Sequence, residues 1–203
     1  QVYESLYPDV SPERYQGVAM AYDSGRGVVV LFGGIHAGAR GNLDETWEWD
    51  GKRWELVCGG TTECQAPPAR FQHALAYDPV NRKTYMFGGE GDGIGHSGYS
   101  DLWAWDGTQW EEVCTHGGDP LCGGGPSKRY VPTMTVDSRR QKLVLVGGYK
   151  SSQPMNDTWE FDGSTWTLIC DDGDCAVPKF WGHMAFPGMV YDPIGGESVL
   201  IGN

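Results

Sequence analysis

The chain has 203 residues, and its 31 glycines and 9 tryptophans accompany a net charge of −12. An acidic surface repels phosphate backbones, so the charge argues against nucleic-acid binding. No apolar run reaches the roughly 18 residues of a membrane span, and no signal peptide begins at Gln1, so a secreted protein would be seen here in mature form or as an internal fragment.

Short strands follow one another along the chain, and no window repeats apolar residues at helical spacing. The first unit contains four predicted strands. Residues 19–23 form an apolar strand that ends in Asp, and residues 28–34 form a strand that ends in Gly-Gly. The third strand, at 44–49, contains two tryptophans, and the fourth, at 54–57, begins with another tryptophan. Asp50-Gly51 between the last two strands predicts a hairpin turn, because these residues tolerate φ > 0. The sequence therefore predicts an all-β fold.

This order of strands recurs twice more and then begins a fourth time. We predict one domain made of four-stranded units at roughly 14–58, 70–114 and 129–170, with a partial unit at 183–203. The Gly-Gly pairs remove side chains where the second strand ends, which lets two backbones approach closely. Eight of the nine tryptophans occupy repeat positions, so we assign them to packing within and between units.

The repeat resembles the kelch family, and most closely the kelch repeats of secreted bacterial proteins. The resemblance rests on Met-Ala-Tyr-Asp, Val-Leu-Phe-Gly-Gly and Asp-Glu-Thr-Trp-Glu-Trp-Asp-Gly, followed by Trp, in the first unit and on their counterparts. It implies a kelch-type β-propeller with three complete blades and a partial fourth, as an open arc or a fragment of a larger ring. It says little about function, because propellers carry many activities.

Kelch propellers usually have five to seven blades, which leaves three interpretations of this arc. The chain is part of a longer polypeptide, an arc of an oligomeric ring or filament, or a ring that closes with a defective fourth blade in which Val2 to Leu6 supply a strand. An open arc exposes an apolar face and a strand edge, so self-association through open blade edges is expected.

Six cysteines fall into three close pairs at the same place in successive units. Neighbour pairing is the simplest of the 15 connectivities that six thiols allow, and zinc is disfavoured because no Cys-x-x-Cys or matching His pair is present. The predicted disulfides imply an extracellular, cell-surface or periplasmic location. They join Cys58 to Cys64, Cys114 to Cys122, and Cys170 to Cys175.

Loop length separates the two faces of the predicted disc. The turns between strands 1 and 2 and between strands 3 and 4 are short, whereas the loops from strand 2 to 3 and from strand 4 to 1 are long and share the other face. Long loops on a rigid scaffold commonly carry function. The predicted ligand-binding residues in these loops are His36, Arg40, Glu90, Asp92, His96, Tyr99, His116, Lys128, Tyr149 and Lys150.

The leading hypothesis is an extracellular scaffold that binds a protein or glycan through this long-loop face. A structural subunit of a surface assembly is one alternative. A secreted oxidase or glycan-active enzyme is another, although no Tyr/His/Cys set for a copper radical oxidase and no sialidase Asp box is present. The acidic stretches at 90–92 and 171–174 do not match EF-hand spacing and are interpreted as ordinary turns. We predict no catalytic residue, cofactor or metal.

Overall fold

A computed structural model describes residues 11–12, 15–36, 41–91, 98–115, 124–171 and 188–201. Every regular element in these ranges is a β-strand, and the sheets include three of four antiparallel strands. Blade 1 comprises β2 (Ala19–Asp23), β3 (Val28–Phe32), β5 (Thr46–Trp49) and β6 (Trp54–Cys58). Blade 2 comprises β7 (Ala74–Asp78), β8 (Lys83–Phe87), β9 (Leu102–Trp105) and β10 (Trp110–Cys114). Blade 3 comprises β11 (Thr133–Asp137), β12 (Lys142–Val146), β15 (Thr158–Phe161) and β16 (Trp166–Cys170).

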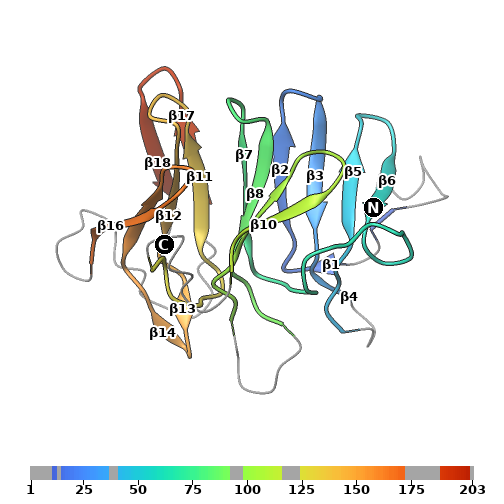
Figure 1. Cartoon of the computed structure of the whole chain (residues 1–203), viewed down its shortest axis with the longest axis horizontal. Helices are drawn as coiled ribbons and strands as arrows, with labels where there is room; N and C mark the ends of the chain where they lie inside the picture. The colour runs from blue at the N-terminus through green and yellow to red at the C-terminus, as the bar shows by residue number, and fades with distance from the viewer. Residues whose placement is uncertain are drawn as a thin grey trace.

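A two-stranded hairpin follows blade 3, formed by β17 (Gly188–Asp192) and β18 (Glu197–Ile201). The first strands of successive units lie against one another, with β2 contacting β7, β7 contacting β11, and β11 contacting β17. The sheets are thus arranged as β-propeller blades in an open arc, and no extensive contact joins β17 back to β2 within the described ranges. Figure 1 shows the short turns of β2–β3, β7–β8 and β17–β18 at its upper edge and the long loops at its lower edge. The predicted all-β propeller arc is confirmed.

An aspartate at the end of each first strand fixes the short turn that follows. In blade 1 the Asp23 carboxylate accepts the backbone N–H groups of Gly25 and Arg26 at 2.9 and 3.0 Å. This side-chain bonding to the backbone two and three residues ahead stabilises the turn and starts the next strand in register. Asp78, Asp137 and Asp192 bond their own turns in the same way.

The Gly-Gly pairs mark close backbone contacts, as predicted, and the structure shows that these contacts join successive units. Gly34 donates its N–H to the Arg70 carbonyl at 2.8 Å. A Cβ on Gly33, which has φ +61°, would collide with that same carbonyl. Gly89 donates to the Arg129 carbonyl at 2.9 Å, so the arrangement repeats one blade later.

Short strands on the long-loop face were not predicted from the sequence. Pairing joins β1 (Tyr15–Gln16) to β4 (Ile35–His36), and β13 (Tyr149–Lys150) to β14 (Gln153–Pro154). The segment 149–156, expected as a plain loop, therefore contains a hairpin. Val2 to Leu6, assigned above to a strand, lie outside the described residues.

Candidate functional site

Two buried arginines join the blades beneath the long-loop face. The Arg70 backbone bonds the Gly34 N–H and the Leu43 carbonyl of blade 1. Its guanidinium crosses into blade 2, where it donates to both Asp101 carboxylate oxygens at 2.7 Å and to the Gly88 carbonyl at 3.1 Å. The side chain is fully buried, and its guanidinium also lies 4.0 Å from the centre of the Tyr99 ring. Arg70 therefore links two blades and supports the loops above it.

Arg129 repeats this role between blades 2 and 3. Its backbone bonds Gly89 and Tyr99, and its guanidinium donates to the Asp157 carboxylate at 2.6 and 2.8 Å. Burial alone would raise the pKa of Asp157, but the Arg129 hydrogen bonds and charge outweigh it and hold the pKa below its ordinary value. Asp157 also accepts the Trp159 indole N–H at 2.7 Å, so both oxygens of the buried carboxylate accept hydrogen bonds.

A chain of backbone hydrogen bonds crosses the three blades at the inner side of this face. Gln72 donates to the Gly17 carbonyl at 2.7 Å, and Val131 donates to the Gln72 carbonyl at 2.8 Å. Gln72 and Val131 have φ of 55° and 53°, a region that is unfavourable for a β-branched residue such as valine. Backbone strain of this kind concentrates at functional sites, and here it lies among the long loops.

His73 is buried next to this chain of bonds. Its ring meets Phe32 edge-on with centroids 5.4 Å apart, and neither ring nitrogen makes a hydrogen bond of standard geometry. Burial, together with the charge of Arg70, lowers the pKa of His73 to about 3. The imidazole is therefore neutral near neutral pH and forms part of the seam between blades 1 and 2.

The β13–β14 hairpin is an exposed element of the long-loop face. Its turn residues Ser151 and Ser152 both have positive φ, 49° and 66°, in a two-residue turn. Asparagine and glycine are the usual residues there, so the two serines make this tip a strained one. Every residue from Lys150 to Pro154 is exposed. Figure 1 shows the hairpin extending from the lower edge of the arc.

Two tyrosines stack at the base of this hairpin. Tyr149 and Tyr130 exchange backbone hydrogen bonds of 2.8 and 3.0 Å, and their rings stack with centroids 5.7 Å apart and planes at 22°. Both side chains are partly exposed, and Lys150 and Lys128 are exposed close by in the sequence. Aromatic faces beside polar and charged groups are typical of binding surfaces. Tyr130 was missed from the sequence because its pairing with Tyr149 crosses from one loop to another.

The predicted ligand-binding residues divide by burial. Glu90 is buried and its backbone pairs with Phe71, whereas Tyr99 is partly buried beneath the face with its ring over the Arg70 guanidinium. His36 is partly buried at the end of β4. Lys128, Tyr149 and Lys150 reach the surface around the β13–β14 hairpin. The other predicted residues lie outside the described ranges, namely Arg40, Asp92, His96 and His116.

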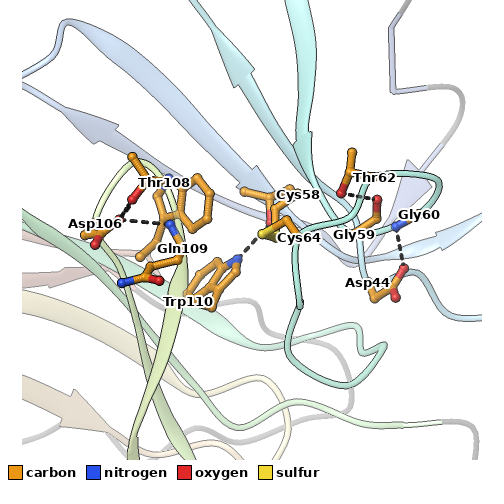
Figure 2. Close-up of a disulfide and its surroundings, with 12 residues drawn as sticks. Asp44, Cys58, Gly59, Gly60, Thr62, Cys64, Asp106, Thr108, Gln109 and Trp110 are labelled. Atoms are coloured by element: carbon orange, nitrogen blue, oxygen red, sulfur yellow. Dashed lines mark hydrogen bonds between the residues drawn. A yellow bond between two sulfur atoms is a disulfide. The ribbon is translucent and has the colours of Figure 1, made fainter.

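The Cys58–Cys64 disulfide is present, as predicted, and lies at the seam between blades 1 and 2. Figure 2 shows it beside Trp110, whose indole N–H donates to the Thr46 hydroxyl at 2.9 Å. Cys114 and Cys170 are also disulfide-bonded. Their predicted partners, Cys122 and Cys175, lie outside the described residues.

Other classes of site receive no support from the described part of the chain. No group of three or more His, Cys, Asp or Glu side chains in these ranges is placed to hold a metal ion. Among the described residues, no helix is long and apolar enough to cross a membrane.

Comparison with known proteins adds partial similarity. No family model matches the chain. The Mei4-dependent protein 6 of Schizosaccharomyces pombe (strain 972 / ATCC 24843) is 30% identical over 115 residues, which cover 51% of this chain and 15% of that protein. The chain thus matches only a small part of this relative, and the similarity assigns no family.

Proposed function

We propose that this chain is a kelch-type recognition module that binds a protein or glycan ligand through its long-loop face, outside the cytoplasm. The observation that carries the proposal is the stacked Tyr130–Tyr149 pair at the base of the exposed β13–β14 hairpin. A preformed aromatic surface on a strained, hydrogen-bonded hairpin loses little conformational entropy on binding. The Cys58–Cys64 disulfide supports an oxidising compartment.

The distribution of charge also supports ligand binding at this surface. In a chain with a net charge of −12, Lys128 and Lys150 are exposed cations on the long-loop face. A ligand with acidic groups would approach this local positive charge in preference to the acidic remainder of the molecule. Acidic glycans and acidic peptide segments are therefore the ligand chemistries that the surface favours.

The test is binding of the purified chain to immobilised panels of neutral and acidic oligosaccharides and of acidic peptides. Tyr149→Ala should weaken any specific signal by at least about fivefold, because truncating an aromatic hot-spot residue removes more than about 1 kcal/mol. Arg53→Ala is the matched control, since Arg53 is exposed in the short 3–4 turn of blade 1 and should bind like the parent. Binding that Tyr149→Ala leaves intact, or no binding to either panel, would contradict the proposal.

A further inference from the structure

Three side chains form a row across the β13–β14 hairpin and the segment that pairs with it. Tyr130 pairs with Tyr149, and Tyr149 pairs with Pro154, both in antiparallel register. Residues that lie directly opposite one another on neighbouring strands point to the same face of a sheet. Tyr130, Tyr149 and Pro154 therefore share one face, which we call the tyrosine platform.

Backbone contacts hold the tyrosine platform in place. The Met155 N–H donates to the Gly148 carbonyl at 2.8 Å, which closes the hairpin at its base. Gly148 has φ +103°, and a Cβ there would lie 2.9 Å from the Tyr130 carbonyl oxygen, so this close approach requires glycine. The centroids of the Tyr130 and Tyr149 rings lie 5.7 Å apart, as in an offset stack, and both side chains are partly exposed. The platform is thus formed before any ligand arrives.

The shape and composition of the platform suit sugar rings. Neighbouring strands are about 5 Å apart, so a row of three side chains covers about 10 Å of sheet. The C–H groups on the flat side of a pyranose ring pack on aromatic and proline rings through dispersion and hydrophobic contact. A flat apolar row of this kind therefore fits the flat side of a sugar chain.

Hydrogen-bonding side chains border the platform. Lys150 and Gln153 form the next cross-strand pair, which points to the opposite face of the hairpin, and Ser151 and Ser152 form the turn between them. All four side chains are exposed. Ammonium, amide and hydroxyl groups can bond the hydroxyl groups of a sugar. An apolar surface with a few polar groups at its border is the usual composition of a small-ligand site.

The segment that builds the platform contains almost no acidic residues. The chain has 27 Asp and Glu residues, yet Asp137 is the only one between Gly124 and Asn156. Asp137 lies at the far end of β11 from the hairpin. Lys128 and Lys150 are exposed in this segment, and neither pairs with a carboxylate in the described ranges. The segment therefore supplies local positive charge in an otherwise acidic molecule.

The edge of the hairpin argues against an extended acidic peptide as the ligand. One common mode of peptide recognition adds the peptide as a new strand to a free sheet edge. The outer strand β14 has only two residues, Gln153 and Pro154, and Pro154 has no N–H to donate. A peptide would therefore keep only side-chain contacts here, whereas a glycan needs no backbone pairing.

We propose that the tyrosine platform binds an acidic glycan. Its pyranose rings pack on Tyr130, Tyr149 and Pro154. Its carboxylate or sulfate groups are bonded by Lys128 and Lys150, because a lysine ammonium pairs with either anion. This inference rests on the ligand-binding function proposed for the long-loop face, and it names the class of ligand at that surface.

Calorimetric titration of the full chain with matched glycan pairs tests the ligand class. Oligogalacturonate carries carboxylates, and its methyl ester has the same sugar rings without the charge. Dextran sulfate and dextran form the second pair, for sulfate. At least one acidic glycan should bind at least about tenfold more tightly than its neutral partner, and the difference should shrink as salt is added. Poly-glutamate is the peptide probe and should bind more weakly than that glycan.

Two sets of variants separate the effect of charge from that of stacking. Lys128→Gln combined with Lys150→Gln should bring the acidic glycan close to the affinity of its neutral partner and leave the neutral partner unchanged. Lys52→Gln is the matched control, because Lys52 is exposed in the short 3–4 turn of blade 1. Tyr130→Ala should weaken both members of a pair, whereas Tyr130→Phe keeps the ring and should bind within about twofold of the parent.

Failure of this inference and failure of the proposed function give different results. Tighter binding of poly-glutamate than of every acidic glycan, or equal binding of the two members of each pair, would overturn the glycan assignment and leave a ligand-binding face. Acidic-glycan binding that the double lysine variant leaves intact would also overturn it. No binding of any glycan or peptide would contradict the proposed function as well. Circular dichroism of each variant separates these outcomes from loss of folding.

Discussion

The seam between blades 1 and 2 and the two ends of the arc are built from the same residue types, yet they differ sharply in burial. At the seam, Leu75 and Phe32 are buried, and Trp105 donates its indole N–H to Glu48 of the neighbouring blade at 2.8 Å. At the ends, Met20 and Ile201 hold the corresponding positions and are exposed. Repeat units bury their apolar faces only against neighbours, so the position of a residue in the array decides its energetic weight.

A second difference concerns buried charge. The seams contain Arg70 and Arg129, each fully buried and each bonded to a carboxylate of the next blade. At the ends, the exposed side chains Met20, Val190 and Ile201 are apolar. Cooperative stability between blades should therefore depend on the arginine pairs.

The largest expected effect comes from breaking a buried ion pair at a covered seam. Arg129→Ala leaves the Asp157 carboxylate buried without its cation and should lower the free energy of unfolding by about 3–5 kcal/mol. Arg140→Ala is the control, because the Arg140 side chain is half exposed at its pairs with Asp137 and Glu160 and should cost about 1 kcal/mol or less. Urea denaturation measures both. Equal losses would mean that burial of the pair has no special weight.

The next effect compares one repeat position in its covered and exposed settings. Leu75→Ala should lower the free energy of unfolding by about 2–4 kcal/mol, because it removes a buried side chain and leaves a cavity. Met20→Ala, measured in dilute solution, should cost about 1 kcal/mol or less, because Met20 is mostly exposed. The two values come from denaturant midpoints of otherwise identical chains. Similar losses at both positions would remove the difference between seam and end.

A smaller, pH-dependent effect should come from His73. Its pKa in the folded chain is about 3, below the unfolded value of about 6.5, so between these values the unfolded state binds a proton that the folded state does not. Stability is therefore lost as the pH falls through this window, by up to about 1.4 kcal/mol per unit. The depressed pKa values of Asp137 and Asp157 add a further loss below about pH 4.

His73→Val should flatten this slope between about pH 6 and 4. Valine is a fair replacement because Val18 and Pro132 hold the same place before the first strands of blades 1 and 3. The measurement is a series of urea denaturations across pH. An unchanged slope in the variant would assign the pH dependence to other groups.

The strands and the order of the blades could be predicted from the sequence because their signals are local. The Asp turns, the Gly-Gly pairs and the Trp-opened fourth strands each depend on neighbouring residues, and the β6, β10 and β16 boundaries begin at the expected tryptophans. The Cys58–Cys64 pair was predictable for the same reason, since only six positions separate the two residues.

The candidate site was predicted only in outline. Loop length identified the long-loop face, its exposed Lys128 and Lys150, and the partly exposed Tyr149. The Tyr130 partner of Tyr149 and the Arg70–Asp101 pair depend on contacts between separate loops and blades, which no local pattern encodes. The burial of Glu90 and the partial burial of Tyr99 follow from the same contacts, so the sequence alone could not separate them from exposed loop residues.

Hydrogen exchange at low protein concentration tests the contrast between seam and ends most directly. At low concentration, β7 in the middle of the arc should be better protected than β2 and the β17–β18 hairpin, because both of its sides are covered. Equal protection of all three, or weaker protection of β7, would contradict the account.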